Sequence, residues 1–431
     1  MAMAVRFGTD GIRGKAYETI TVDLAYRLGR AVGSVFDAPV FVGYDTRESS
    51  PVLAAAVLAG VTSVGGQVTN LGVFTTPGVA VIAQRRDGVG IVVSASHNPY
   101  YDNGLKVLGL GGTKLDLATE EAVTEALNAA PSPTSDVFPA VPIDEQAQHD
   151  YAQHLRAIVP SDLSSLTIVL DCANGASSSV AHELFEATGA RVITLHDQPT
   201  GHNINESCGS THPDDLMAAV VAHGADLGLA FDGDADRLIA VDATGTIRDG
   251  DDLMVLFALD STEVRRTGVV VTSMSNLGLR RAMHQHGIAL VETDVGDRNV
   301  LIALEEREWS FGGEQSGHLI FRDLSPTGDG LLTGLRLAEL VARRGPLATL
   351  ADEAWHRVPQ ALINVPHENY DDDAVRHLFE ALQRQHALSD DDVRLLIRPS
   401  GTEPVVRIMV EASNGSFVDD FVIALGRHFS I

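Results

Sequence analysis

Three aspartates separated by single residues lie in a short polar turn between two apolar runs of the chain. Asp232, Asp234 and Asp236, called the aspartate trio below, would repel one another unless a hard cation lay between them. Oxygen ligands favour Mg²⁺ or Ca²⁺, and three carboxylates leave coordination positions open for a phosphate oxygen. An EF-hand is excluded, because its sixth and twelfth positions would be Arg237 and Ala243 instead of glycine and glutamate. The alternative to a metal site is a solvated acidic loop.

Ser96 follows an apolar, strand-like run and begins a polar turn that ends at Pro99. A serine hydroxyl is a poor nucleophile unless a base, a metal ion or a good donor assists it. His97 is next to it, and Arg237 beside the aspartate trio has a planar guanidinium suited to holding a phosphate. The Gly-X-Ser-X-Gly elbow of hydrolases is absent, which argues against acyl transfer. Residues 94–99, called the serine loop, therefore indicate either phosphoryl chemistry or an ordinary turn.

A glycine-bracketed segment at residues 313–318, called the sugar loop, carries three side chains that suit a carbohydrate. Glu314 and Ser316 can make paired hydrogen bonds to neighbouring sugar hydroxyls, and His318 can exchange a proton near neutral pH. A structural turn would need the same glycines. The segment therefore indicates sugar binding only in combination with the other motifs.

The segment Arg398–Pro404, called the anchor loop, has the composition of an anion cradle. The guanidinium of Arg398, the hydroxyls of Ser400 and Thr402 and the backbone N–H of Gly401 can surround a phosphate. Such a cradle would hold the phosphate that does not react, and orientation of this kind contributes roughly 7–11 kcal/mol in favourable cases. Taken alone, the segment also fits a simple turn.

The chain has 431 residues, of which 45% are apolar and 21% charged, and this length predicts three or four domains. No apolar run approaches the roughly 20 residues of a membrane span, and the N-terminus lacks the pattern of a secretion signal. We therefore expect a cytoplasmic protein with no membrane partner. In that compartment its two cysteines, Cys172 and Cys208, are expected to be free thiols.

The formal net charge of −27 argues against nucleic acid as a partner, because binding the phosphate backbone requires a basic face. An anionic substrate is compatible with this charge, since charges beyond about 8–10 Å are largely screened. Basic residues near the site therefore decide whether an anion can bind. The chain has 28 arginines but only three lysines, and one of them, Lys106, lies ten residues after Ser96. The position of so scarce a residue favours a role in the site.

A strand–helix–strand plan occurs three times along the chain. The repeats begin with β-type runs at residues 39–45, 166–171 and 269–272. A third strand in each repeat leads into a motif, and these strands are at residues 91–93, 227–231 and 308–311. Ligands bind beyond the carboxyl ends of strands in open α/β sheets, so three similar α/β domains around a common cleft are predicted. The alternative is coincidence, because strand–helix–strand units are common.

Changes in composition suggest the domain boundaries. Residues 130–143 are rich in proline, serine and alanine and predict a linker or surface loop, with further breaks near 245–250 and Pro359. After the last break, a helical pattern is followed by two strand-like runs, which predicts a small α+β domain. The expected domains are residues 1–145, 146–247, 248–358 and 359–431.

Taken together, these motifs resemble the α-D-phosphohexomutase superfamily, and most closely its bacterial phosphoglucosamine mutase family. The matching segments are Phe7–Gly14, Ser94–Pro99, Asn205–Pro213 and Gly313–His318. Gln315 and the Ser-Gly-Thr-Glu-Pro ending at Pro404 favour this family over phosphomannomutases and phosphoglucomutases. The resemblance covers essentially the whole chain and implies an α/β fold: three similar α/β domains with mixed sheets plus a smaller C-terminal α+β domain around a central cleft.

The resemblance also implies roles for individual residues. Ser96 would be the phosphoserine, with Lys106 as first and His318 as second candidate for proton transfer, and with His97 and Arg13 around the reacting phosphate. One Mg²⁺ per chain would be held by Ser96 and the aspartate trio of Asp232, Asp234 and Asp236. Substrate binding would involve Gly296, Asp297, Arg298, Glu314, Ser316, Arg237, Arg398, Ser400, Gly401 and Thr402.

The implied reaction acts on a phosphorylated amino sugar. The phosphoserine would convert glucosamine 6-phosphate to the glucosamine 1,6-bisphosphate intermediate, which would turn over in the cleft and return the 6-phosphate to Ser96. The product, glucosamine 1-phosphate, feeds UDP-N-acetylglucosamine and peptidoglycan precursor synthesis, and a homodimer would suit the family. The alternatives are a phosphomannomutase/phosphoglucomutase, a non-catalytic sugar-phosphate sensor, and a phosphatase that hydrolyses the phosphoserine.

Overall fold

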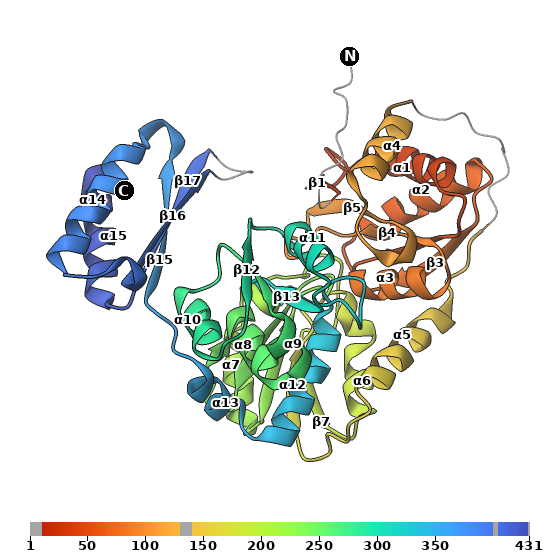
Figure 1. Cartoon of the computed structure of the whole chain (residues 1–431). Coiled ribbons are helices and arrows are strands. Elements are labelled where there is room, and N and C mark those ends of the chain that lie inside the picture. The colour runs from red at the N-terminus through yellow and green to blue at the C-terminus, as the bar shows by residue number, and fades with distance from the viewer. Residues whose placement is uncertain (1–10, 130–139, 400–403, 430–431) are drawn as a thin grey trace.

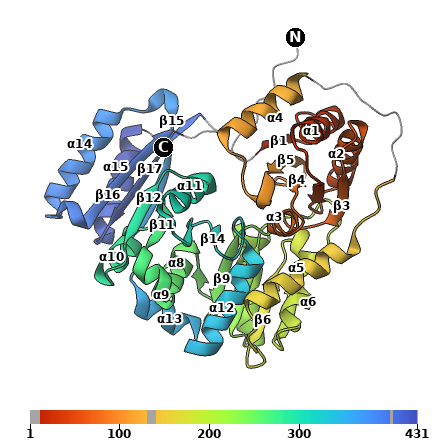
Figure 2. The ribbon, with the colours of Figure 1, turned by 45° about the vertical axis from the view of Figure 1, so that its right-hand side comes forward.

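The computed structural model describes residues 11–129, 140–399 and 404–429. Four sheets follow one another along the chain, each covered by helices, and we refer to the four units as domains I to IV. Figures 1 and 2 show domains I, II and III side by side in an arc, with domain IV next to domain III.

Domain I has a five-stranded mixed sheet. Its strands are β1 (Ile12–Lys15), β2 (Val40–Tyr44), β3 (Val68–Val73), β4 (Val89–Val93) and β5 (Asp102–Leu108). Its helices are α1 (Val22–Val35), α2 (Ser50–Ser63), α3 (Thr76–Arg85) and α4 (Leu117–Ala129). The strand order is β1-β5-β4-β2-β3, with β2 parallel to β3 and β4, and β5 antiparallel to β4 and β1. Every residue of β4 is buried, as expected for a strand with helices on both faces of its sheet.

Domain II repeats this plan. Its strands are β6 (Thr167–Asp171), β7 (Arg191–Leu195), β8 (Leu227–Phe231), β9 (Leu238–Asp242) and β10 (Ile247–Arg248). Its helices are α5 (Glu145–Ile158), α6 (Ala181–Glu186) and α7 (Asp214–His223). The order is β10-β9-β8-β6-β7, with β6, β7 and β8 parallel and β9 antiparallel to β8.

Domain III has a shorter version of the same sheet, in the order β12-β11-β13-β14. Its strands are β11 (Val269–Thr272), β12 (Leu290–Thr293), β13 (Phe311–Gly313) and β14 (Leu319–Phe321). Its helices are α8 (Gly250–Asp260), α9 (Thr262–Thr267), α10 (Leu277–Gln285), α11 (Asp297–Arg307), α12 (Gly330–Arg344) and α13 (Leu347–Ala354). The third strand was expected at residues 308–311 but begins only at Phe311, because Glu308 ends α11 in a left-handed conformation.

The three sheets share one connectivity, which confirms the predicted repeat. The repeat begins at β2 in domain I, at β6 in domain II and at β11 in domain III. This strand lies between the next two strands of the chain and is parallel to both, and an antiparallel strand follows. The serine loop follows β4, the aspartate trio follows β8, and the sugar loop follows β13. Equivalent ends of three equivalent strands therefore carry the three motifs.

Domain IV is a smaller α+β unit, as predicted, and its sheet is antiparallel. Its strands are β15 (Gln360–Pro366), β16 (Val393–Pro399) and β17 (Val405–Ala412), in the order β15-β17-β16. Its helices are α14 (Asp372–Gln385) and α15 (Gly415–Phe429). Its apolar side chains form a cluster of their own, which contains none of the core residues of the other domains.

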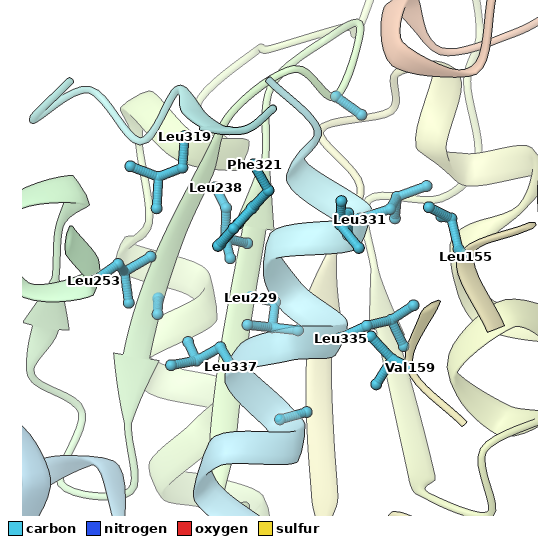
Figure 3. Packing of buried hydrophobic residues seen from close by; sticks show 14 of the residues in the cluster. Leu155, Val159, Leu229, Leu238, Leu253, Leu319, Phe321, Leu331, Leu335 and Leu337 are labelled. Carbon is cyan, nitrogen blue, oxygen red and sulfur yellow. The ribbon is translucent and has the colours of Figure 1, made fainter. Parts of the chain in front are cut away.

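Helix α12 packs domain III against domain II. Figure 3 shows Leu331 and Leu335 of this helix on the side of Val159, which follows α5, and Leu337 on the other side, with Leu229 of β8 between them in the view. Burial of a leucine side chain contributes about 1.5–3 kcal/mol, so this helix is a major link between the domains. The cluster it belongs to reaches from domain I through domain II into domain III.

Two expectations from composition can be compared with the structure. Cys172 and Cys208 are both buried free thiols, as predicted. Among the described residues, no helix combines the length and the hydropathy that crossing a bilayer would need.

Candidate active site

Ser96 lies directly against the aspartate trio, although the two are far apart in the sequence. Its Oγ donates a hydrogen bond to Asp232 Oδ2 at 2.6 Å, across 136 positions of the chain. The side chain is buried, and its backbone is left-handed with φ of 53°. An unfavourable backbone geometry in a non-glycine residue persists only where surrounding contacts hold it.

Those contacts come from two domains. The buried guanidinium of Arg47 donates to the carbonyl oxygens of Ser96, Asn98 and Asp102 at 2.9, 2.8 and 3.1 Å. From domain II, Asn205 Nδ2 donates to the carbonyls of Ser96 and Asn98 at 2.9 and 3.1 Å. The serine loop is therefore held by the backbone oxygens, which leaves the Ser96 hydroxyl to face the trio.

The trio turn and the serine loop touch at a glycine. A Cβ on Gly233 would lie 2.5 Å from the carbonyl oxygen of Ser96, which no side chain can tolerate. Glycine at this position thus permits the approach of domain I and domain II that brings Ser96 to Asp232.

The aspartate trio has the properties of a site for a hard cation. One carboxylate oxygen from each of the three residues lies within 4.8 Å of the others, and all three side chains are buried. Asp234 Oδ1 and Asp236 Oδ1 are buried without a hydrogen-bond partner in the described part of the chain. Burial, together with the charges of Asp236 and Asp234, raises the pKa of Asp232 well above its ordinary value. A divalent cation would satisfy these oxygens and offset the repulsion.

Lys106 projects from β5 toward the trio. Its Nζ lies 2.6 Å from Asp234 Oδ2 and 3.7 Å from Asp236 Oδ2. Burial acts to lower the pKa of Lys106, but the charges of Asp234 and Asp236 outweigh it and raise that pKa. The side chain is thus a cation at neutral pH and can donate a proton.

Two histidines face the same site with opposite protonation. His97 Nδ1 lies 3.2 Å from Ser96 Oγ, and burial with the charge of Arg237 lowers the pKa of His97 to about 4. His318 Nδ1 lies 3.7 Å from Asp236 Oδ1. Burial would lower the pKa of His318, but its interaction with Asp236 and the neighbouring carboxylates raise it to about 9. At neutral pH His97 is therefore uncharged and His318 is a cation.

Domains I, II and III enclose a cleft of about 190 Å³ beside these groups. Arg13 of β1 lines it, and the β1–β5 register pairs Arg13 with Gly104, two residues before Lys106. Arg237 also lines it, and its backbone N–H donates to Asp232 Oδ1 at 3.2 Å. Basic groups thus gather locally in a protein whose overall charge is strongly negative.

The sugar loop borders the cleft through two of its three predicted residues. Glu314 and His318 line the cleft, and Glu314 Oε1 accepts a hydrogen bond from Gly296 N at 3.0 Å. Ser316 Oγ is buried and has no hydrogen-bond partner among the described residues. Glu314 therefore also positions the start of α11.

Residues 296–298, which were expected to bind substrate, form the beginning of helix α11, and Gly296 precedes the helix with φ of 123°. Arg298 makes contacts across to domain I, where Nη1 lies 2.7 Å from Glu120 Oε2 and Nη2 donates to the Leu115 carbonyl at 3.2 Å. Asp297 pairs with Lys114 of domain I. We call this set of contacts the clasp, because it joins domains I and III beside the cleft.

The anchor loop is only partly described, since Ser400, Gly401 and Thr402 lie outside the described residues. Arg398 lies at the end of β16 and is paired in register with Arg407 of β17. Burial and the positive charge of Arg407 lower the pKa of Arg398, while the charge of Glu314 acts in the opposite direction. Arg398 is thus electrostatically coupled to the sugar loop of domain III.

Four residues of this region are not predicted by the sequence motifs: Thr76, Lys114, Glu120 and Arg407. Thr76 donates a hydrogen bond to Asp234. Lys114 and Glu120 belong to the clasp, and Arg407 is the register partner of Arg398. The scarcity of lysine in this chain was a usable signal for Lys114. No local pattern distinguishes Glu120 or Thr76, because their partners are more than a hundred positions away.

Sequence models of the phosphoglucomutase/phosphomannomutase family match along nearly all of the chain. The three alpha/beta/alpha domains match residues 4–133, 149–245 and 249–358, and the C-terminal domain matches residues 362–422. The chain belongs to this family. The number and order of the family's domains agree with those predicted from the sequence.

Individual relatives agree with this membership. Phosphoglucosamine mutase from Rhodococcus jostii (strain RHA1) is 45% identical over 425 residues, which cover 95% of each chain. Among solved structures, a phosphoglucomutase/phosphomannomutase family protein from Burkholderia thailandensis aligns with a TM-score of 0.79 at 26% identity, covering 99% of this chain and 98% of that one. N-acetylphosphoglucosamine mutase from Aspergillus fumigatus, solved with GlcNAc-6P and magnesium, has a TM-score of 0.68 at 18% identity over 98% of this chain and 95% of that one.

Proposed function

We propose that the protein is a phosphoglucosamine mutase, which interconverts glucosamine 6-phosphate and glucosamine 1-phosphate through a phosphoserine enzyme. The observation that carries this proposal is the 2.6 Å contact between Ser96 Oγ and Asp232 Oδ2. The trio is buried, and two of its carboxylate oxygens have no hydrogen-bond partner among the described residues. The 45% identity to a phosphoglucosamine mutase over 95% of the chain supports the choice of an amino sugar as substrate.

The proposed donor is Ser96 carrying a phosphoryl group. In the first half of the reaction its Oγ–P bond breaks and O1 of glucosamine 6-phosphate takes the phosphoryl group, which gives glucosamine 1,6-bisphosphate. In this half O1 loses its proton and the freed Ser96 oxygen takes one up. In the second half the reoriented intermediate returns its 6-phosphoryl group to Ser96 Oγ, which loses its proton while O6 of the sugar takes one up, so the proton count is unchanged over the cycle. Arg13, Arg237 and His97 lie where they can contact the transferring group.

Mg²⁺ is the proposed cofactor, held by Ser96 and the aspartate trio, and when bound it would neutralise charge on the transferring phosphoryl group. Lys106 is held as a cation by Asp234 and Asp236 and is the first candidate for proton transfer, as the donor to the oxygen that leaves the phosphoryl group. His318, with its pKa raised to about 9, is the second.

Sugar recognition is assigned to Glu314 and Ser316, and the non-reacting phosphate to the anchor loop. The 1,6-bisphosphate must present either end to Ser96, so the anchor must accept whichever phosphate is distal. The charge of Glu314 acts to raise the pKa of Arg398, which lies at the base of the anchor loop. Asp297 and Arg298 are expected to act mainly through the clasp.

The proposal is tested by replacing Ser96. The wild-type chain is expected to carry one phosphate on the Ser96 peptide by intact mass and peptide mapping. Ser96→Ala is expected to lose this phosphate and at least about a thousandfold of mutase activity. Ser179→Ala removes a serine hydroxyl in domain II, away from the serine loop of domain I. It is the matched control and is expected to retain the phosphate and the mutase activity.

Substrate preference is tested by comparing kcat/KM for glucosamine 6-phosphate and mannose 1-phosphate. The amino sugar is expected to be preferred. A preference of more than about tenfold for mannose 1-phosphate, equal to about 1.4 kcal/mol, would instead assign the chain to the phosphomannomutases. An unphosphorylated Ser96 with full activity would exclude the phosphoserine route.

A further inference from the structure

Thr76 connects the first turn of a domain I helix to the aspartate trio of domain II. Its Oγ1 donates a 2.6 Å hydrogen bond to Asp234 Oδ2, and its backbone N–H donates to the Asp234 carbonyl at 3.0 Å. Both residues are buried, and they are 158 positions apart in the sequence. Side chain and backbone of one aspartate are therefore held by a single residue of another domain.

The helix start explains why this backbone contact is available. Helix α3 begins at Thr76, after the cap Thr75, whose Oγ1 accepts the N–H of Gly78 at 3.0 Å. N–H groups in the first turn of a helix have no partner within the helix. The N–H of Thr76 is one of these, and the carbonyl of Asp234 satisfies it.

The two oxygens of the Asp234 carboxylate have different surroundings. Oδ2 accepts from Thr76 Oγ1 and from Lys106 Nζ, both at 2.6 Å. Oδ1 is buried and has no hydrogen-bond partner among the described residues. Two donors on one oxygen restrict rotation of the carboxylate, so the other oxygen is held in a constant position.

We propose that Thr76 is a positioning residue for the cation site, which orients Asp234 so that Oδ1 is available as a metal ligand. The inference rests on the proposed function, because it requires the trio to hold a divalent cation. Outer partners of metal ligands typically change metal affinity by about 10–100-fold when they are removed. Lys106 remains on Oδ2 after loss of the Thr76 hydroxyl, so the lower end of that range is expected.

The test measures metal binding directly. The full-length protein is stripped with a chelator, its Ser96 phosphorylation is matched by intact mass, and Mn²⁺ binding is titrated by electron paramagnetic resonance. Thr76→Ala is expected to raise the Mn²⁺ Kd about tenfold. Thr76→Ser retains the hydroxyl and is expected to restore a wild-type Kd. Thr62→Ala, which removes a hydroxyl bonded to Leu58 O in helix α2, is the matched control and is expected to leave the Kd unchanged.

Mutase kinetics provide a second readout that a loss of stability alone would not produce. Thr76→Ala is expected to lower kcat at limiting Mg²⁺ and to recover at high Mg²⁺, with KM for the sugar phosphate unchanged. Thermal unfolding of the metal-free variants is recorded alongside, and Thr76→Ala and Thr62→Ala are expected to be folded.

The outcomes separate this inference from the proposed function. Equal Mn²⁺ affinities for wild type and Thr76→Ala would overturn the role of Thr76 alone. Equal weakening by Thr76→Ser or by Thr62→Ala would also overturn it, because the hydroxyl would then not be responsible. Wild-type protein that binds no Mn²⁺, or binds it equally well after Asp232→Asn, would overturn the cation site itself.

Discussion

Two arginines on neighbouring strands of domain IV carry like charges at directly opposed positions. Arg398 of β16 and Arg407 of β17 are register partners, and opposed residues of an antiparallel pair share one face of the sheet. Like charges placed this way destabilise a sheet by roughly 0.2–1 kcal/mol unless an anion lies between them. The lowered pKa of Arg398, caused by burial and then by Arg407, reflects this proximity. The pair is therefore suited to bind a phosphate dianion.

Replacing Arg407 with methionine is expected to raise KM for the sugar phosphate by about 10–100-fold. The reason is the loss of a charge-assisted hydrogen bond to the distal phosphate, which contributes about 1.5–3 kcal/mol. Steady-state kinetics check this, with Arg384→Met on the exposed face of α14 as the matched control. An unchanged KM in Arg407→Met would show that Arg407 does not bind the distal phosphate, and this role would then belong to Arg398 alone.

At the scale of elements, helix α12 begins with a buried acid. Asp329 caps the helix by accepting the N–H of Leu332 at 3.0 Å, and it also accepts the hydroxyl of Tyr151 from α5 at 2.9 Å. Burial raises the pKa of Asp329 to about 6, although both hydrogen bonds act to lower it. The helix that packs domain III against domain II thus starts at a group that titrates just below neutral pH.

The sign of the resulting pH dependence follows from the two pKa values of Asp329. The unfolded side chain has a pKa of about 3.9, so between about pH 4 and 6 the folded state binds the proton more tightly. Stability contributed by this group is present at low pH and is lost as pH rises through 6. The difference between the folded and unfolded pKa values corresponds to at most about 3 kcal/mol of unfolding free energy.

Asp329→Asn is expected to flatten this dependence, because asparagine caps a helix and accepts the Tyr151 hydroxyl but does not ionise. Relative to wild type, the variant should gain up to about 3 kcal/mol of unfolding free energy between pH 4 and 7. Urea unfolding followed by tryptophan fluorescence measures the unfolding free energy of the domain that contains α12, since both tryptophans, Trp309 and Trp355, lie in domain III. Asp371→Asn makes the same change at the exposed cap of α14. Parallel pH profiles for wild type and Asp329→Asn would contradict the expectation.

The elements differed in how well their sequence predicted them. Strand β8 and the trio turn were predictable because a fully apolar run ends abruptly at alternating aspartates. The start of α11 was not predictable, because Gly296 followed by two charged residues also fits a turn. The hydrogen bond from Gly296 N to Glu314, which is distant in sequence, fixes where the helix begins. Thr76 was missed for another reason: a threonine before a proline predicts a helix start, but says nothing of a partner in another domain.

At the scale of the whole molecule, the domains are not equally independent. Domains I, II and III share one continuous apolar cluster, whereas domain IV has a separate cluster. The contacts between domains III and IV include polar ones, for example Leu277 N to Glu411 Oε1 at 3.0 Å and Arg394 Nη1 to the Ser275 carbonyl at 3.0 Å. Polar contacts exchange with water more readily than a shared core does, so domain IV is the unit expected to move when substrate enters.

The clasp joins domains I and III beside the cleft. Arg298 and Glu120 are mostly shielded from solvent, at 12% and 18% side-chain exposure, so their attraction is less screened than that of a surface pair. Lys114 and Asp297 form a second pair beside the first, and three of these four residues line the cleft. The proposed bisphosphate must stay in the cleft while it reorients, and we expect the clasp to hold domains I and III together during this step.

Loss of the clasp is therefore expected to let the intermediate escape. Arg298→Gln and Glu120→Gln should each increase release of glucosamine 1,6-bisphosphate per turnover several-fold, measured by chromatography of the reaction mixture. Because the two side chains act as a pair, the double variant should be no worse than the stronger single variant, with a coupling energy of about 0.5–3 kcal/mol. Arg343→Gln, which breaks an exposed pair with Asp260 on the outside of domain III, should release no more bisphosphate than wild type. Strictly additive effects of the two substitutions would contradict the clasp and would favour direct binding of the substrate by Arg298.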